Sequence, residues 1–441
     1  MIAHNNDTRH KKPLTPAWTP LRFHPVQFAL WWSQSRITVI PAGRGSGKTE
    51  LSRRRIVSKL IDEKPWPDPI YFYGMPTYGQ AKRVAWKPIL SLIPKSWIDS
   101  VSYSDLIVRT IFGSELHVVG LDQPQRIEGT QWDGCVIDES SDIKPSTFDM
   151  SILPALTHRN GWCWRTGVPK RFGIGAAEYR EFYEAVVAGE VEDAAAFSWP
   201  SSDIVSHEQI KLARSIMDER DFDEQFNASF LNASGGIFHA FDESFNVRPC
   251  GYNPSLPILV GSDFNVDPMA WVIGHRYGNR IEVFDEVWLR NTNTQATLDA
   301  LYNRYQHHTG GFEFYGDASG QSRSTAAAVS DVTQIYNDTR FKKLGRSIMY
   351  LRSNPSIADK FAAANALICS GDGNRRLHID PKCKRLIADL SSRAYKAGTR
   401  KVDDGKDQGH ISDALCYIIY RLFPILPIVD GGTEIRITGT R

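Results

Sequence analysis

The chain has 441 residues, of which 41% are hydrophobic and 23% charged, and its formal net charge is +2. A chain of this length is expected to form two to four domains. Its apolar content is high enough to exclude a chain that is disordered as a whole. No apolar run approaches the ~18–20 residues of a membrane helix. The six cysteines form no CxxC pair, so neither a disulfide framework nor a zinc site is expected.

The first part of the chain alternates short β-rich runs with helical stretches. After a polar segment over residues 1–20, which we expect to be flexible, a first domain is predicted over 21–232. Its expected strands are 37–41, 69–74, 116–119 and 134–138, and its expected helices are 50–61 and 80–93. Alternation of this kind predicts a mostly parallel α/β sheet.

A second strand pattern follows a segment rich in Gly, Pro, Asn and Ser, over residues 233–256, which we interpret as a linker. The second domain is predicted over 257–423, and the tail over 424–441 is either a short strand or disordered. Strands are expected at 257–264, 271–275, 280–287 and 312–317, and a helix at 408–422.

The strongest motif is the segment 41–49, which reads PAGRGSGKT between an expected strand and an expected helix. This context is that of a P-loop, in which glycines let backbone N–H groups surround phosphates at a helix N-terminus. Lys48 would reach the β- and γ-phosphates of ATP, and Thr49 would ligate Mg²⁺. The other predicted nucleotide contacts are Gly43, Arg44, Gly45, Ser46 and Gly47. Ala42 replaces the usual first glycine, and the alternative is a glycine-rich turn that ends in Lys-Thr.

The partner of this motif is the apolar run 134–137, which ends in Asp138 and Glu139. It is typical of a Walker B strand, in which Asp138 would hold Mg²⁺ through water and Glu139 would orient the attacking water. Strands often end in acids, so the motif is weak alone and strong when paired with a P-loop.

Four further residues of this half are weaker candidates. Thr166 follows an apolar run where a strand that senses the γ-phosphate would lie, although a plain turn is the alternative. Gln27 could contact adenine or lie on the surface. Arg126 and Arg44 are candidates for an arginine finger, and either could instead form a structural ion pair.

Three acids of the second domain form another constellation. Asp263 and Asp317 each end an expected strand, and Asp413 lies near the start of the expected helix. This is the layout of RNase H-like nucleases, in which two Mg²⁺ or Mn²⁺ ions ~3.5–4 Å apart activate water and stabilise the leaving oxygen. Glu286 could be a fourth acid or an exposed strand-edge residue, and His410 could position Asp413 or cap the helix.

Basic residues are concentrated between the second and third acids. Residues 340–401 contain fifteen Lys and Arg against four Asp. Because this run brackets the expected phosphodiester site, we interpret it as a surface that follows the DNA backbone; a solvated basic face is the alternative.

The order of these motifs resembles the large terminase subunit, the DNA-packaging motor of tailed bacteriophages. The segments that carry the resemblance, which spans residues 21–423, are AGRGSGKT at 42–49, MPTYGQA at 75–81, RIEG at 126–129 with VIDE at 136–139, and HISDAL at 410–415. The chain departs from the family at Ala42 and in the segment 166–169, TGVP, where a polar third residue is common.

The resemblance implies an N-terminal P-loop ATPase domain of the RecA/ASCE type and a C-terminal RNase H-like nuclease domain. It implies that ATP hydrolysis drives double-stranded DNA into the procapsid and that the nuclease cuts concatemers. The implied partners are DNA, the portal protein, the small terminase subunit and further copies in a pentameric ring, in the host cytoplasm and outside the mature virion. The alternatives are a cellular P-loop helicase or repair ATPase with an RNase H-like nuclease domain, and an assembly protein.

Overall fold

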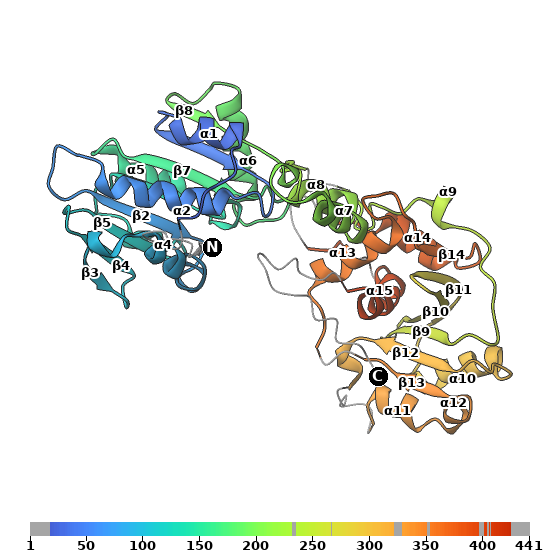
Figure 1. The fold of residues 1–441 in the computed structure, drawn as a ribbon. Helices are drawn as coiled ribbons and strands as arrows, with labels where there is room; N and C mark the ends of the chain where they lie inside the picture. The colour runs from blue at the N-terminus through green and yellow to red at the C-terminus, as the bar shows by residue number, and fades with distance from the viewer. Residues whose placement is uncertain are drawn as a thin grey trace, which may run out of the picture. The chain divides into compact units, whose positions relative to one another are not determined.

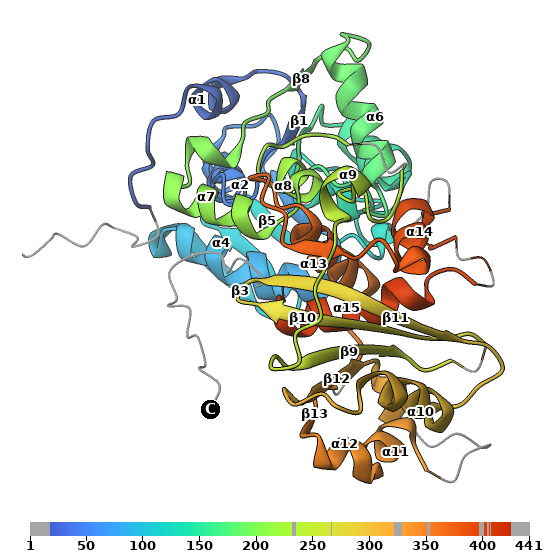
Figure 2. The same ribbon diagram turned by 90° about the vertical axis from the view of Figure 1, so that its right-hand side faces the viewer.

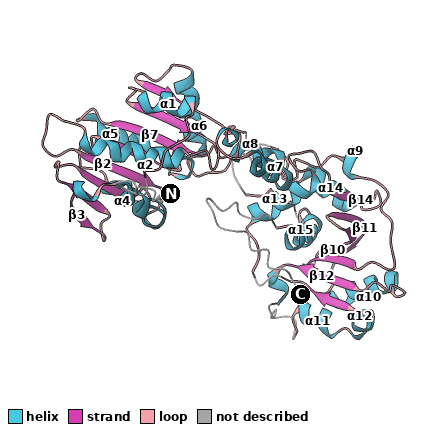
Figure 3. Ribbon diagram, viewed as in Figure 1, coloured by secondary structure: helices cyan, strands magenta, loops and turns pink. Residues whose placement is uncertain are grey.

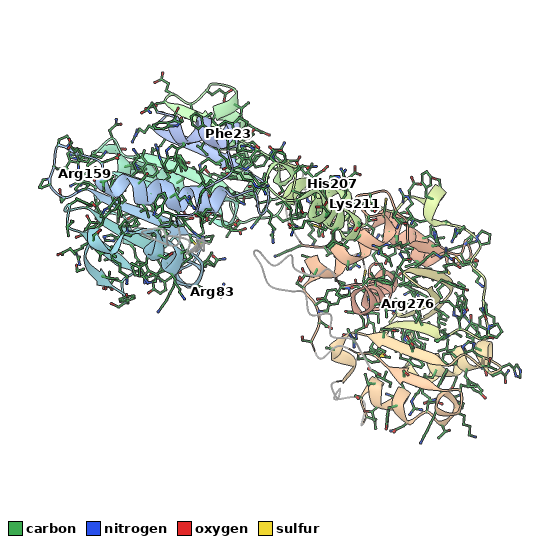
Figure 4. The ribbon with its side chains drawn as sticks, in the orientation of Figure 1. Phe23, Arg83, Arg159, His207, Lys211 and Arg276 are labelled. Carbon is green, nitrogen blue, oxygen red and sulfur yellow. The ribbon has the colours of Figure 1, made fainter. Side chains whose placement is uncertain are left out.

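The computed structural model describes residues 18–231, 235–265, 267–321, 329–350, 353–396, 401–403, 405 and 407–424. These residues divide into two compact units, which we call unit 1 and unit 2. Within the described chain, unit 1 comprises 18–207 and 223–231, and unit 2 comprises 208–222 and the residues from 235 onward. His207 and Lys211, labelled in Figure 4, lie on either side of the first division. The predicted tail over 424–441 lies outside the described residues, except for its first residue.

The segment 208–222 belongs to unit 2, whereas the sequence pattern assigns it to the first domain. The reason is its contacts with residues far along the chain. The buried Asp218 pairs with His239 at 3.2 Å, and the backbone N–H of Gly371 donates to the carbonyl of Met217 at 2.8 Å. These contacts could not be seen from local sequence.

Unit 1 is built on one sheet with strand order β3-β4-β5-β2-β6-β7-β1-β8 (Figure 1). Pairing is parallel from β5 to β8, and β3 and β4 add an antiparallel edge. The strands are β1 (Ile37–Pro41), β2 (Ile70–Met75), β3 (Ile98–Ser102), β4 (Ile107–Thr110), β5 (Glu115–Gly120), β6 (Gly134–Ile137), β7 (Trp162–Gly167) and β8 (Ala194–Ala196). The predicted parallel α/β sheet is confirmed.

Helices cover both faces of this sheet, which is why its central strands are buried along their whole length. Ile40 and Tyr73 point to the face of α2 and α4, and Val39 and Phe72 point to the face of α5 and α6. The helices are α1 (Pro25–Trp32), α2 (Lys48–Ser58), α3 (Tyr78–Gln80), α4 (Lys87–Leu92), α5 (Leu153–Thr157) and α6 (Ala176–Val187).

The helix predicted over 80–93 is interrupted by a wider π-helical turn, η2 (Ala81–Trp86). Pro88 has no backbone N–H, so it cannot bond to the carbonyl four residues before it, that of Val84. Arg53 supplies a donor instead, since its guanidinium lies 3.0 Å from this carbonyl.

Unit 2 is built on a sheet with strand order β13-β12-β9-β10-β11-β14. The strands β9, β10 and β11 form an antiparallel meander, and β12 pairs with β9 in parallel. The strands are β9 (Ile258–Asp263), β10 (Met269–Tyr277), β11 (Arg280–Leu289), β12 (Phe312–Gly316), β13 (Arg346–Ile348) and β14 (Leu377–Ile379). The predicted strands of this half are therefore confirmed.

Helices also enclose the sheet of unit 2, with α13, α14 and α15 on one face and α10, α11 and α12 on the other (Figures 2 and 3). Their bounds are α9 (Glu243–Asn246), α10 (Thr294–Tyr305), α11 (Asp331–Asn337), α12 (Thr339–Lys343), α13 (Ile357–Ile368), α14 (Lys384–Ser392) and α15 (His410–Leu422); α7 (His207–Ile216) and α8 (Glu219–Gln225) lie around the divisions between the units. No helix in the described part of the chain has the length and apolar character needed to cross a membrane.

Candidate functional site

The P-loop candidate connects β1 to α2, as predicted, and its backbone conformation requires glycine at two positions. Gly45 and Gly47 have φ angles of 70° and 82°, in the left-handed region that L side chains rarely adopt. α2 begins at Lys48, directly after Gly47, so the loop leads into the N-terminus of an eleven-residue helix. Such a terminus attracts anions through its unpaired N–H groups and its dipole.

Neighbouring segments of unit 1 hold the loop in this shape. The carbonyl of Ser46 accepts hydrogen bonds from the Gln27 amide and the Trp199 indole, each at 2.9 Å. A Cβ added to Gly43 would lie 2.3 Å from the Ser201 hydroxyl oxygen, so only glycine fits there. Gln27, predicted as an adenine contact, therefore contacts the loop itself.

Two polar groups of the loop have the chemistry of a phosphate site. The hydroxyl of Ser46 is buried and has no hydrogen-bond partner among the residues that the structure describes. Lys48 is only 6% exposed, and its Nζ atom lies 3.3 Å from the carbonyl of Gly43, within the loop that it would share with a phosphate. A buried donor without a partner is costly, and a phosphate oxygen would satisfy it. These residues fit a nucleotide with its Mg²⁺, for which Thr49 follows Lys48 in the first turn of α2.

Asp138 lies directly after β6, and its carboxylate is held by donors from three places. It accepts hydrogen bonds from the Tyr73 hydroxyl at 2.7 Å, the Thr166 hydroxyl at 2.8 Å and the backbone N–H of Glu139 at 3.0 Å. The order β6-β7-β1 brings Asp138, Thr166 and the P-loop to the same edge of the sheet. Ligands of open α/β sheets bind at this carboxyl edge.

Glu139 and its surroundings form the other part of this edge. Glu139 has φ 56° and ψ 46°, a conformation that is uncommon for a residue other than glycine and that often marks a functional position. Its carboxylate lies 3.7 Å from the ammonium of Lys170, which also pairs with Asp142.

The two arginine candidates lie in different environments. Arg44 is half-buried within the P-loop, where its backbone N–H donates to the carbonyl of Gln225 at 2.6 Å. Arg126 is exposed and ends a short 3₁₀ turn, Pro124–Arg126. Both stay predictions as arginine fingers.

The three acids of unit 2 come to one edge of its sheet. Asp263 ends β9 and Asp317 follows β12, the parallel neighbour of β9, while Asp413 lies in the first turn of α15, which packs on these strands. Burial raises the pKa of Asp263, and the negative charges of Asp413 and Asp317 add to this rise, while contact with His410 opposes it. Burial also raises the pKa of Tyr417, and all three acids contribute.

Basic side chains already contact two of these acids. Asp413 Oδ1 lies 2.8 Å from the Lys360 ammonium and 2.8 Å from the Arg393 guanidinium. Burial opposes ionisation of Asp413, but these two cations outweigh it and lower its pKa. His410 Nδ1 lies 2.8 Å from Asp263 Oδ2. A cavity of about 300 Å³ opens beside them, lined by Asp263, Phe264, Asn265, Arg393, Gln408, Gly409, His410 and Asp413.

The predicted metal ligands do not form a ready-made metal centre. Across the described ranges, no three His, Cys, Asp or Glu side chains are grouped so that they could hold a metal ion. The acids share a sheet edge, as expected, but Asp413 contacts protein cations. The residues in place do not fit a three-carboxylate metal centre.

Glu286 contributes to the fold rather than to the acid site. Its two carboxylate oxygens accept the backbone N–H groups of Arg385 and Leu386, each at 3.1 Å, at the start of α14. This is the position of a helix cap, where a carboxylate also complements the helix dipole.

The basic run over 340–401 is not one exposed surface. Among the described members, those whose side chains contact acids or backbone carbonyls of unit 2 include Arg340, Arg346, Lys360, Arg375, Arg376, Arg393 and Lys396. Members that remain exposed include Lys342, Lys343, Lys382, Lys384 and Arg385. Its predicted DNA contact is therefore restricted to these and a few other exposed positions.

Sequence reasoning missed Lys360, Arg393 and Tyr73 as members of the two sites. Lys360 did carry a signal, because it is a single cation among the buried positions of the apolar helix α13. Tyr73 lies within a buried strand, and nothing in the local sequence marks it as a member of a site.

Comparisons with known proteins give matches in sequence and in fold, although no protein-family model matches the chain. It is 23% identical over 253 residues to the terminase large subunit of Thermus virus P23-45. That match covers 50% of this chain and 51% of the relative, so the chain spans about half the length of the curated relatives it matches.

Solved structures give a match over almost the whole chain. The large terminase of a thermophilic bacteriophage aligns with a TM-score of 0.55 at 14% identity, over 91% of this chain and 99% of that one. The same terminase in complex with ADP aligns with a TM-score of 0.54 at 15% identity, over 90% and 99%. The predicted fold class is confirmed at the level of the fold, as two α/β units that are each built on a sheet of their own. These matches in sequence and fold confirm the resemblance to large terminase subunits that the motifs indicate.

Proposed function

We propose that the chain is a viral DNA-packaging motor, in which unit 1 hydrolyses ATP to move double-stranded DNA and unit 2 cuts that DNA. The observation that carries the proposal is the presence of two sites in one terminase-like chain. In unit 1 the P-loop candidate and Asp138 share a sheet edge, and in unit 2 the three acids share another.

In unit 1, the proposed chemistry is hydrolysis of the γ-phosphate of ATP. Lys48 contacts the β- and γ-phosphates, while Thr49 and Asp138 hold Mg²⁺, which when bound neutralises charge on the phosphates. Glu139 orients the attacking water. Arg44, or Arg126 from this or a neighbouring copy, stabilises the charge of the transition state.

In unit 2, the proposed chemistry is cleavage of the DNA backbone at Asp263, Asp317 and Asp413. The sequence predicts two Mg²⁺ or Mn²⁺ ions with oxygen ligands here, whereas the described side chains are not grouped to hold one, so the metal stays a prediction. Exposed lysines and arginines of the basic run contact phosphates, so the binding carries little sequence specificity.

The proposed partners follow from this role. The chain acts as a ring of copies, with five expected, on the portal protein of the procapsid, and the small terminase subunit delivers the DNA. The site of action is the cytoplasm of the infected host, and the mature virion does not retain the protein.

The test uses the full chain in two assays, ATP turnover and plasmid cleavage with Mg²⁺ or Mn²⁺. Lys48→Ala should abolish ATP turnover and keep cleavage with Mn²⁺, whereas Asp317→Ala should abolish cleavage and keep ATP turnover. Each variant is the control for the other, because each must show that the remaining activity is intact. Loss of both activities in either variant, or of neither, would contradict the assignment of the two sites.

A further inference from the structure

Unit 1 carries a group of basic side chains that the proposed ATP site does not use. Residues 18–207 contain 21 Lys and Arg and 21 Asp and Glu, so this stretch has no formal net charge. Residues 69–98, in contrast, contain no acid and four bases, which are Lys82, Arg83, Lys87 and Lys95. All four are exposed, and Figure 4 shows Arg83 at the surface of unit 1. This segment is therefore strongly positive within a stretch of chain that is neutral as a whole.

The wide helical turn η2 and the helix α4 that follows it place three of these bases on the outside of unit 1. The apolar residues that hold this segment in the core are Ala81, Ala85, Trp86 and Ile89. Lys82, Arg83 and Lys87 fall between these buried positions, and their side chains are exposed to solvent. Burial of one side of the segment therefore leaves its other side with three neighbouring positive charges.

The helix that begins at the P-loop fixes this turn in place. Arg53 lies on α2, four residues after Thr49, and its guanidinium donates to the carbonyl of Val84 at 3.0 Å. Pro88 leaves that carbonyl without its usual helical donor, so the contact with Arg53 satisfies it. The three bases are therefore mounted on backbone that is already ordered, and one side chain connects that backbone to α2.

The opposite face of the same sheet carries the opposite charge. Residues 174–193, which include α6, contain six acids and one base. This helix packs on the face of Val39, whereas η2 and α4 pack on the face of Ile40 (Figure 1). A polyanion is attracted by a positive surface and repelled by a negative one. The charge distribution of unit 1 therefore directs a polyanion to the face of η2 and α4.

We propose that Lys82, Arg83 and Lys87 form a surface of unit 1 that contacts the phosphates of double-stranded DNA. The inference rests on the proposed motor function and adds a contact to it, because that function places its DNA contacts in unit 2. Lysine is depleted at interfaces between proteins, whereas Lys and Arg contacts with phosphates supply most of the affinity of non-specific DNA binding. Contacts of this kind do not depend on base sequence, which suits a motor that moves along DNA.

The test measures how DNA binding by the full-length chain depends on salt. Fluorescence anisotropy of a labelled duplex gives the binding constant at several salt concentrations, in EDTA so that the DNA is not cut. Each phosphate contact contributes about 0.9 to the slope of the logarithm of the binding constant against the logarithm of the salt concentration. A triple variant with Lys82→Gln, Arg83→Gln and Lys87→Gln should therefore lose roughly 2 to 3 from the magnitude of this slope.

The control variant carries Arg22→Gln, Lys64→Gln and Arg180→Gln, which remove three positive charges from other parts of unit 1, and its slope should match that of the wild type. An unchanged slope in the triple variant, or an equal loss in the control, would overturn the inference and leave the proposed function standing. Loss of self-association in sedimentation, with the slope unchanged, would assign the surface to a protein partner and also overturn it. If the wild type does not bind the duplex even at low salt, the proposed function fails as well. Should the triple variant not fold, as judged by its melting transition, Arg83→Gln alone should lose about 0.9 from the slope.

Discussion

Removal of the Thr166 hydroxyl tests whether Asp138 is held in position by its neighbours. Asp138 is 1% exposed and accepts three hydrogen bonds, one of them from Thr166 at 2.8 Å. Thr166→Val keeps the side-chain shape and leaves the buried carboxylate one donor short. A hydrogen bond to a charged group contributes about 1.5–3 kcal/mol. The equilibrium constant for local opening of this part of the sheet should therefore rise roughly 10- to 150-fold.

Hydrogen–deuterium exchange measured on peptides from β6 and β7 reports this local opening. Thr166→Ser is the matched control, because it keeps the donor and loses only a methyl group; its exchange should stay near that of the wild type. ATP turnover should fall in Thr166→Val with a higher Mg²⁺ requirement, since Asp138 is the proposed Mg²⁺-binding acid. Exchange in Thr166→Val as slow as in the wild type would refute the reasoning, because the hydroxyl would then contribute nothing to holding Asp138.

Three further predictions concern single residues. The pKa of Asp413 is lower in the folded chain than its ordinary value of 3.8. Its contribution to the free energy of unfolding is therefore present above pH 3.8 and is lost as the pH falls through the lower pKa of the folded state. The melting temperature of Asp413→Asn should therefore lie well below that of the wild type at neutral pH, and this difference should narrow in acid. A difference that does not depend on pH would exclude the ion pairs as its source. Lys170→Met should raise basal ATP turnover by releasing Glu139, and the free energy of unfolding should change by only about 1 kcal/mol, because the pair is partly exposed to solvent. A fall in turnover would show that Lys170 supports Glu139. Glu286→Ala should destabilise unit 2 by about 1 kcal/mol through the lost cap of α14 and keep plasmid cleavage within about twofold; a loss as complete as that expected for Asp317→Ala would place Glu286 in the acid site.

The P-loop and its sheet were predictable because their signals are local. Glycines at 45 and 47 are needed where the backbone has positive φ, and the apolar run before them is a fully buried strand. The position of Gln27 was not predictable, because its contact with the carbonyl of Ser46 depends on how α1 packs against the loop. The three donors to Asp138 come from three separate segments, and only Glu139 is its neighbour in sequence.

The acid site of unit 2 likewise combines features that could be predicted from local sequence with features that could not. The sequence places an acid at the end of β9, another after β12 and a third at the start of α15, and parallel pairing of β9 with β12 makes two of them neighbours. The basic run, in contrast, looks uniform in sequence. The fold turns some of its members into buried ion pairs and leaves others exposed, because a helix presents successive residues to different surroundings.

Local sequence patterns were enough to predict the order of the two units, the strands and helices that carry the motifs, and the residue types at each site. These depend on local periodicity, glycine conformations and strand ends, all of which are written in short segments. Three features became visible only in the folded chain: segment 208–222 packs with unit 2, Glu286 caps a helix, and Asp413 is paired with Lys360 and Arg393. The partners of Asp413 and Glu286 lie between 20 and 100 residues away in the chain. Their pairing follows from the burial of charged groups, which must find opposite charges or hydrogen bonds wherever the fold places them.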